Sequence, residues 1–224
     1  SDISARHQQL VLKKRCPGIE TIVQYKPGAG GGLMWAQINS MPADGFNVIG
    51  INLPHIVLQP FEGQVQYKTD DILPVYWFHY TPDAIVVPAD SPIKSFQDLI
   101  KAAKAQPGKL SFATSASRNL SHITGEMLKS VTGIDMLHVP YKGSPQAAQD
   151  TIAGQTQLFI DSIPTMSAFI KSGRLKVVGV SSARRMPGFE DVPAIAETIP
   201  GFEAVGWFAI VAPANTPADI IARM

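Results

Sequence analysis

Polar side chains able to bind an anion gather in the segment from Thr114 to His122, which reads Thr-Ser-Ala-Ser-Arg-Asn-Leu-Ser-His. The segment joins an expected strand to the start of an expected helix, where backbone N–H groups and the helix dipole favour an anion. Its hydroxyls add neutral donors, and Arg118 can offer two parallel hydrogen bonds to a carboxylate. Helix capping by Asn119 or Ser117 is the structural alternative, but it accounts for one residue only. We therefore predict an anion site formed by Thr114, Ser115, Ser117, Arg118 and Asn119.

Two further polar segments also follow expected strands. One contains Asn52 and His55, and the other contains Asp161 and Ser162. The Asp161 carboxylate can either accept from an amine or hydroxyl of a ligand or cap the helix that follows, and the sequence leaves both alternatives open. Because ligands of α/β sheets bind at the carboxyl ends of strands, both segments are candidates for the binding site.

The sequence contains no complete motif for nucleotide binding, hydrolysis or metal binding. The glycine-rich segment 27–32 fails the GxGxxG pattern, because Leu33 stands where the last glycine is required. The GxxxxGK(S/T) and GxSxG motifs are absent, and the five histidines are scattered without an HExxH pattern. We expect no catalytic residue, no metal site and no cofactor. The glycine segment, with Ala29 and Gly30, instead allows close approach of backbone or of a small anion.

Strands and helices alternate along the chain. Segment 95–105 is the clearest helix: its apolar residues share one face, and Ser95 is placed to cap it. The other expected helices are 3–12, 33–41, 120–131, 144–153, 163–172, 193–198 and 217–224. The expected strands are 19–25, 46–53, 73–78, 84–87, 109–113, 135–139, 158–160, 175–180 and 205–211. This alternation predicts an α/β fold with mostly parallel sheets and flanking helices on both faces.

Composition excludes several classes of protein. The 224 residues carry a net charge of +1, which argues against broad nucleic-acid binding, a function usually marked by a basic stripe. The single cysteine, Cys16, excludes an internal disulfide and a cysteine-based zinc site. No stretch reaches the roughly 18 apolar residues of a membrane helix, and residues 1–6 do not resemble a signal peptide.

An ordered set of short motifs resembles one family, the tripartite tricarboxylate transporter substrate-binding proteins, also called the Bug or TctC family. The most specific of these motifs is HVPYKG at 138–143. The others, in chain order, are PGAGG at 27–31, ADGF at 43–46, QPGKL at 106–110, SH at 121–122, GQ at 154–155, DVP at 191–193, PGF at 200–202, Trp207, and APANTP at 212–217. The resemblance covers essentially the whole chain.

This resemblance implies a two-lobed periplasmic-binding-protein fold of type II, the Venus-flytrap arrangement. We expect one lobe from residues 1–83 plus 206–224 and the other from residues 84–205. Crossover strands near 84–87 and 205–211 would act as the hinge. Family chains begin earlier and continue further, so we expect both ends of the lobe formed by residues 1–83 and 206–224 to be truncated here.

The resemblance also implies a function without chemistry. The protein would be a periplasmic receptor, and a monomer, that captures a small organic carboxylate for a membrane permease. A di- or tricarboxylate, an aromatic acid and an acidic amino acid all fit this class. Loops from both lobes would line the ligand site. Its members would be Ser1, Asp2, Ala29, Gly30, Asn52, His55, Thr114, Ser115, Ser117, Arg118, Asn119, Asp161, Ser162 and Trp207.

The chain departs from the family pattern in the segment that carries the predicted anion site. The family usually has glycines where Ala116 and Arg118 stand, and threonine where Asn119 stands. We therefore hypothesise that Arg118 contacts the ligand directly. Two other functions remain open: the effector-binding domain of a transcription regulator, which has a similar two-lobed architecture, and an enzyme acting on a carboxylic acid with Asp161 or His122 as base.

Overall fold

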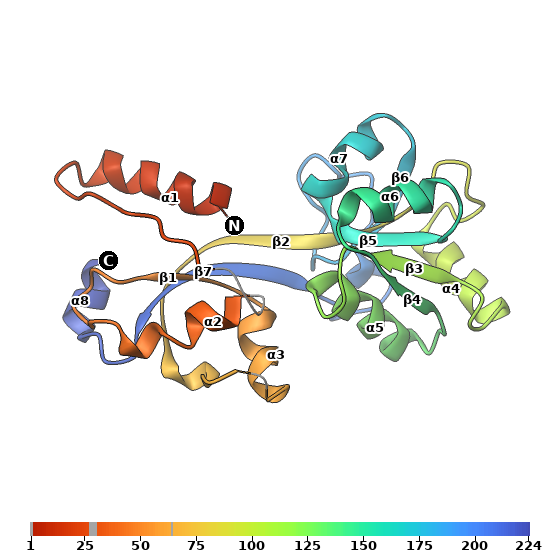
Figure 1. The fold of residues 1–224 in the computed structure, drawn as a ribbon. Helices are drawn as coiled ribbons and strands as arrows, with labels where there is room; N and C mark the ends of the chain where they lie inside the picture. The colour runs from red at the N-terminus through yellow and green to blue at the C-terminus, as the bar shows by residue number, and fades with distance from the viewer. Residues whose placement is uncertain (1, 27–30, 64) are drawn as a thin grey trace. The chain divides into compact units, whose positions relative to one another are not determined.

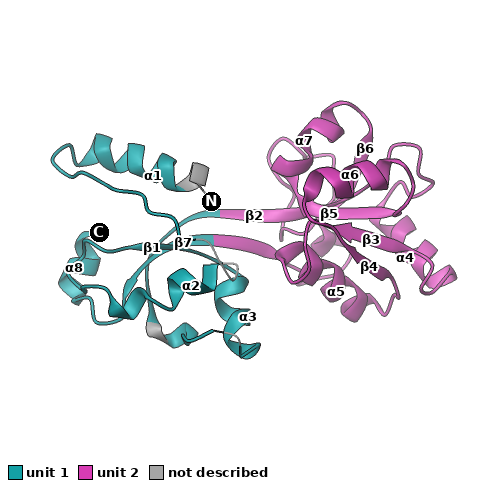
Figure 2. Ribbon diagram, in the orientation of Figure 1, with its two compact units in different colours: residues 1–79, 208–224 teal, residues 80–207 magenta. Residues whose placement is uncertain are grey.

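The computed structural model describes residues 2–26, 31–63 and 65–224, with backbone alone at residues 2–4 and 71. The chain forms two compact units, shown in different colours in Figure 2. One unit combines Ser1–His79 with Phe208–Met224, and the other is Tyr80–Trp207. The chain therefore passes between the units twice, within strands β2 (Ile72–Pro88) and β7 (Val205–Pro213).

The unit Tyr80–Trp207, called unit 2 below, alternates strands and helices. After β2 its elements are α4 (Phe96–Ala105), β3 (Ser111–Thr114), α5 (Leu120–Thr132), β4 (Leu137–Pro140), α6 (Ser144–Ile152), β5 (Leu158–Ser162), α7 (Ile163–Lys171), β6 (Leu175–Val180) and the 3-10 turn η4 (Ile195–Glu197). The strands lie in the order β6-β2-β5-β3-β4. Strand β3 is parallel to β4 and β5, whereas β2 is antiparallel to β5 and β6.

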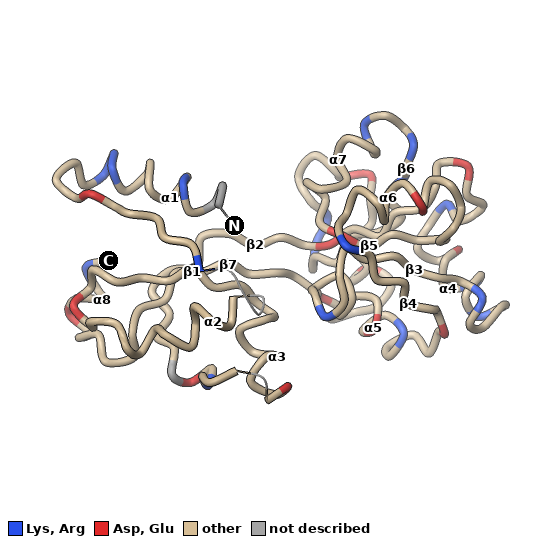
Figure 3. The backbone as a smooth tube through the Cα atoms, viewed as in Figure 1, with Lys and Arg blue, Asp and Glu red and all other residues tan. Residues whose placement is uncertain are grey.

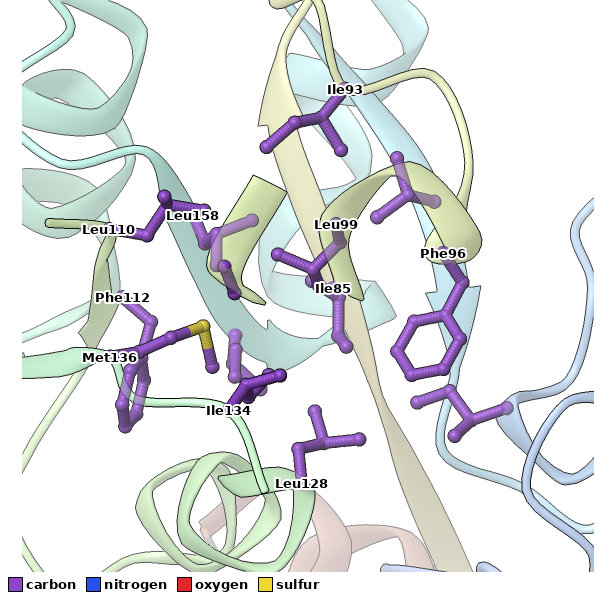
Figure 4. Close-up of a cluster of buried hydrophobic side chains, with 14 of the residues drawn as sticks. Ile85, Ile93, Phe96, Leu99, Leu110, Phe112, Leu128, Ile134, Met136 and Leu158 are labelled. Carbon is purple, nitrogen blue, oxygen red and sulfur yellow. The ribbon is translucent and has the colours of Figure 1, made fainter. Parts of the chain in front are cut away.

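Helices cover both faces of this sheet (Figure 1). Successive side chains of a strand point to opposite faces, so Ile85 joins one buried cluster and Val86 joins another. The first cluster packs α4 and α5 against the sheet and includes Phe96, Leu99 and Leu128 (Figure 4). The second packs α6 and α7 against the other face. Packing on both faces therefore fixes the positions of the strand ends relative to the helices that follow them.

The other unit, called unit 1 below, has its own core. Its elements are α1 (Asp2–Arg15), α2 (Gly32–Trp35), η2 (Ile38–Ser40), β1 (Ile49–Asn52), α3 (His55–Phe61), η3 (Thr69–Asp71) and α8 (Ala218–Arg223). Strand β1 pairs antiparallel with β7, from Ile49 opposite Val211 to Asn52 opposite Phe208. The buried Trp35 donates its indole N–H to the Gly50 carbonyl over 3.1 Å.

The predicted α/β fold class is confirmed, and the expected helix at 95–105 is α4, with the Ser95 hydroxyl accepting from the Asp98 N–H. Three expectations about strands are wrong. Residues 19–25 form no strand: Ile22 is 77% exposed, and an alternating pattern is stable as a strand only when it pairs and buries one face. Segments 73–78 and 84–87 belong to one continuous strand, β2. The sheet of unit 2 is mixed rather than mostly parallel, because β2 runs against β5 and β6.

Within the described part of the chain, no helix combines the length and the apolar character needed to cross a membrane.

Candidate functional site

One edge of the sheet in unit 2 brings polar residues together. Strands β3, β4 and β5 run parallel, so their carboxyl ends meet at this edge. Thr114 ends β3, and Asp161 lies near the end of β5. Strand β2 runs the other way, and its pairing places Asp83 opposite Ser162 at the same edge. Two predicted site residues, Thr114 and Asp161, therefore lie at one edge of the sheet. The carboxyl group of Asp83, which the sequence did not indicate, lies at the same edge.

The loop between β3 and α5 is held by its own side chains. Asn119 is the N-cap of α5: its side-chain oxygen accepts from the His122 N–H over 3.0 Å, and its amide donates to the Ser115 hydroxyl over 3.1 Å. The Thr114 hydroxyl donates to the Ala116 carbonyl over 2.8 Å. The capping alternative is thus confirmed for Asn119. Ser117, the other candidate cap, is exposed in the loop.

Arg118 adopts a backbone conformation unusual for its residue type. Its φ of 61° lies in the left-handed region, which costs a residue with a Cβ about 1–2 kcal/mol. Its backbone N–H donates to Nδ1 of His122 over 3.0 Å, which helps to hold this turn. The side chain is exposed. The turn therefore positions a guanidinium group just before the N-terminus of α5.

Two histidines stack beside this loop. The rings of His122 and His138 lie 3.8 Å apart at 11°, and His138 also stacks on Phe112 at 5.0 Å. Nε2 of His138 is 2.7 Å from the Thr114 hydroxyl. Because that hydroxyl donates its own proton to Ala116, we assign the imidazole as the donor. Burial, aided by the charge of His122, lowers the pKa of His138 to about 4, so the ring is neutral at pH 7.

Asp161 is 7% exposed, and both its oxygens accept hydrogen bonds. Oδ2 accepts from the Ser144 hydroxyl over 2.6 Å, and Oδ1 accepts from the Ser162 N–H over 2.7 Å. The N-cap residue of α7 is Ser162, and no side chain caps that helix. The alternative in which Asp161 caps the following helix is therefore wrong.

Asp83 is the functional candidate that sequence reasoning missed. It is 2% exposed, and its carboxyl group accepts from the Thr124 hydroxyl over 2.9 Å and from the Ser121 hydroxyl over 3.4 Å. Burial, together with the charge of Asp161, raises the pKa of Asp83 to about 7, although the two hydroxyl groups act in the opposite direction. The available signal was one acidic residue directly before the apolar run 84–87, which predicts that the acid enters the buried part of a strand.

The aromatic candidate Trp207 also belongs to unit 2. Its ring lies 5.3 Å from that of Tyr80, and both side chains are exposed. These two residues stand at the two points where the chain enters and leaves this unit.

The remaining predicted residues lie in unit 1 or outside the described residues. Asn52 and His55 contact each other there, with 2.9 Å between the Asn52 side-chain nitrogen and Nδ1 of His55. Burial lowers the pKa of His55, and the charge of Glu62 raises it to a smaller extent. Asp2 is the first residue of α1. Ser1, Ala29 and Gly30 lie outside the described residues.

Within the part of the chain that the structure describes, neither a group of metal ligands nor the hollow beside Pro88 adds a second candidate site. Among the residues that the structure describes, no three His, Cys, Asp or Glu side chains could hold a metal ion together. A hollow of about 230 Å³ includes Pro88 and Gln157 in its lining, so it lies at the opposite edge of the sheet from Asp83 and Asp161. Acidic and basic residues are interspersed over both units (Figure 3).

Comparison with known proteins adds independent evidence. The family model described as "Tripartite tricarboxylate transporter family receptor" matches residues 5–224. A curated relative from Pseudomonas sp. (strain P51), a UPF0065 protein, is 34% identical over 210 residues. The match covers 92% of this chain and 62% of that protein, so the chain spans less than two thirds of the relative's length.

Two solved structures are similar over nearly the whole chain. A TctC solute binding protein from Polaromonas has a TM-score of 0.87 at 27% identity, covering 97% of this chain and 74% of the other. Rpa4515 of R. palustris, solved with adipate, has a TM-score of 0.78 at 29% identity, covering 99% of this chain and 75% of the other. Together with the family match, these similarities show that the chain belongs to the tripartite tricarboxylate transporter receptor family, the Bug and TctC proteins that its motifs resemble.

Proposed function

We propose that this protein is a periplasmic receptor that captures a small organic carboxylate and delivers it to a membrane permease. Membership of the receptor family supports this function. The structure of Rpa4515, a relative 29% identical to this chain, contains adipate, which is a dicarboxylate. We further propose that the two passages of the chain between the units, in β2 and β7, serve as the hinge for ligand capture.

The observation that carries the proposal is the loop between β3 and α5. The first turn of a helix presents N–H groups without partners inside the helix, and the helix dipole favours a negative charge there. The hydroxyl of Ser117 and the guanidinium of Arg118 are exposed in this loop. A carboxylate bound here would meet neutral and charged donors together, which suits recognition of a small anion.

The ligand class can be tested by thermal denaturation with a panel of organic acids. We expect at least one acid among adipate, succinate, citrate, glutamate and benzoate to raise the melting temperature. A ligand at 100 times its dissociation constant stabilises the folded state by about 2.7 kcal/mol. A broad panel that gives no stabilisation would contradict the proposed function.

The role of Arg118 needs a separate test. If its guanidinium binds the carboxylate, Arg118→Ala should weaken binding by more than about tenfold, because a charge-assisted hydrogen bond contributes about 1.5–3 kcal/mol. Arg184→Ala is the matched control, since Arg184 is another exposed arginine of unit 2. Isothermal titration calorimetry on both variants would measure the difference. Equal affinities for the two variants would exclude direct contact by Arg118.

A further inference from the structure

Two buried carboxyl groups lie on neighbouring strands at the edge of the sheet where the loop between β3 and α5 begins. Asp83 is 2% exposed and Asp161 is 7% exposed. Ala84 pairs with Asp161 and Asp83 pairs with Ser162, so the two acids are one register step apart on β2 and β5. Buried carboxylates are costly unless they are paired with a cation or carry a proton. Asp161 accepts two hydrogen bonds, whereas burial raises the pKa of Asp83, so Asp83 needs a charge-compensating group or a proton.

Among the described residues, the side chains that hydrogen-bond to Asp83 are the neutral hydroxyls of Ser121, Thr124 and Ser181. From α5, Ser121 and Thr124 donate hydroxyl hydrogen bonds to its carboxyl group. At the end of β6, the Ser181 hydroxyl accepts from the Asp83 backbone N–H over 2.8 Å. From β5, Asp161 contributes a like charge, which raises the pKa of Asp83 further. A proton is the remaining way to neutralise this carboxyl group.

The same helix turn contacts both Asp83 and the candidate anion site. Asn119 and Leu120 begin this turn on the loop side, and Ser121 donates to Asp83 from within it. An anion bound at the loop and a negative Asp83 would share this turn and repel each other. With a pKa of about 7, Asp83 changes its protonation near neutral pH. Ligand binding at the loop and proton binding at Asp83 can therefore influence each other through the first turn of α5.

We propose that ligand capture in unit 2 is linked to protonation of Asp83, so that an organic anion and a proton are bound together. The inference rests on the proposed carboxylate-binding function and adds a proton to it. Linkage is reciprocal: if the anion favours the protonated acid, protonation must favour binding of the anion by the same factor. The protonation state of Asp83 changes the electrostatic repulsion that the bound anion experiences, so Asp83 does not need to touch the ligand.

The expected effect is a loss of affinity as the pH rises. If the bound anion raises the pKa of Asp83 by about one unit, affinity falls about tenfold between pH 6 and pH 9. Adipate, succinate, citrate and benzoate are suitable probes, measured by isothermal titration calorimetry between pH 6.5 and pH 9. Most of their carboxyl groups are already ionised in this range, so a loss of affinity reports mainly on the protein.

The variant Asp83→Asn tests the assignment. The amide keeps the size of the side chain but cannot ionise, so the variant should bind with nearly constant affinity from pH 6.5 to pH 9. Asp90→Asn is the matched control, because Asp90 is an exposed acid just beyond the C-terminal end of β2. It should keep the pH dependence of the unmodified protein. His122 is a second titratable group on this turn, and a slope that persists in Asp83→Asn would assign the proton elsewhere and overturn the inference.

A measurement on the unmodified protein covers the case in which Asp83→Asn does not fold. Titrations at pH 7.5 in triethanolamine and in Tris, two cationic buffers that differ in ionisation enthalpy and do not compete for an anion site, give the number of protons taken up with the ligand. We expect uptake of a fraction of one proton, and no uptake would overturn the inference. If none of the four acids binds at any pH, the proposed function fails and the inference with it. Binding that is independent of pH contradicts the inference alone.

Discussion

Two titratable residues of unit 2, the buried Asp83 and the partly buried His138, affect stability in opposite directions. The pKa of Asp83 is raised from 3.8 to about 7 in the folded state, so its favourable contribution is present below about pH 4 and is lost as the pH rises through 7. The pKa of His138 is lowered from 6.5 to about 4, so its contribution is present above about pH 6.5 and is lost as the pH falls through 4. The two contributions partly cancel over the same range of pH.

Replacing one of these residues should reveal the effect of the other on the pH dependence of stability. Relative to the unmodified protein, Asp83→Asn should become more stable as the pH rises from 4.5 to 8, by on the order of a few kcal/mol. The reason is that the variant no longer ionises a buried acid, while His138 contributes equally to both proteins. Urea unfolding at pH 4.5, 6 and 8 would measure the difference.

Asp90→Asn serves as the control for this comparison. Asp90 is exposed, so its replacement should change stability by a similar small amount at every pH. A constant difference between Asp83→Asn and the unmodified protein across the three pH values would show that Asp83 does not titrate in this range.

At the scale of elements, helix α5 connects the candidate site with the core. Its N-cap, Asn119, accepts from the His122 N–H and so fixes the turn that faces the loop. Its middle, at Gly125, lies against the ring of Phe112 on β3. Phe112 in turn stacks on His138. The position of the loop therefore depends on both the cap and the packing of this helix.

The cap and the anion site can be separated by two substitutions of Asn119. Asn119→Ala should lower the free energy of unfolding by about 1 kcal/mol, because the cap hydrogen bond is lost. Asn119→Asp should retain stability, since aspartate also caps helices and its charge suits the helix N-terminus. The same charge should repel a carboxylate ligand and weaken its binding. If Asn119→Asp binds the ligand as tightly as the unmodified protein does, the anion does not bind at this turn.

The close approach of α5 to β3 requires glycine. A Cβ at Gly125 would lie 2.3–2.9 Å from carbons of the buried Phe112 ring. Gly125→Ala should therefore destabilise the protein by up to about 2 kcal/mol, since overpacking costs about 1–3 kcal/mol and helix propensity returns about 1 kcal/mol. Chemical denaturation would measure this change. The exposed position Ser130 on the same helix provides the control Ser130→Ala.

A double substitution tests the cause of that effect. In a Phe112→Leu background the ring is absent, so Gly125→Ala should cost less than it does in the unmodified protein. Equal costs in the two backgrounds would mean that contact with the Phe112 ring is not the reason for glycine at this position.

At the scale of the whole molecule, each unit has a separate hydrophobic core. Unit 2 buries Leu99 completely, and unit 1 buries Ile49 to 3% exposure. The chain joins the units only through β2 and β7 within the described residues. Each core should therefore determine the local stability of its own unit.

Hydrogen exchange measured by mass spectrometry would test this independence. Leu99→Ala and Ile49→Ala each remove buried atoms, at a cost of about 2–5 kcal/mol. Leu99→Ala should reduce protection of amides in residues 80–207 and leave residues 31–63 and 208–224 unchanged. Ile49→Ala should do the reverse. Equal loss of protection throughout the chain in either variant would show that the two units unfold as one.

Local patterns were sufficient for most helices of unit 2. Helix α4 follows from Ser95 and the apolar spacing after it, and α5 ends where Gly133 adopts a left-handed conformation with φ of 66°. The pattern failed at residues 19–25, where alternation is present but Ile22 remains 77% exposed. It also failed at β2, because a strand that continues through Pro82 depends on neighbours far away in sequence.

The sequence by itself determined the α/β class, the family and the loop before α5 as the candidate for an anion. The fold class follows from the local spacing of apolar residues, because short-range interactions form helices and strands. The family follows from the ordered motifs, which related chains share. Only the tertiary structure decided that Asn119 caps α5, that His122 and His138 stack, and that Asp83 lies beside Asp161. The physical reason is that burial and charge coupling arise between residues distant in the chain, through strand register and helix packing.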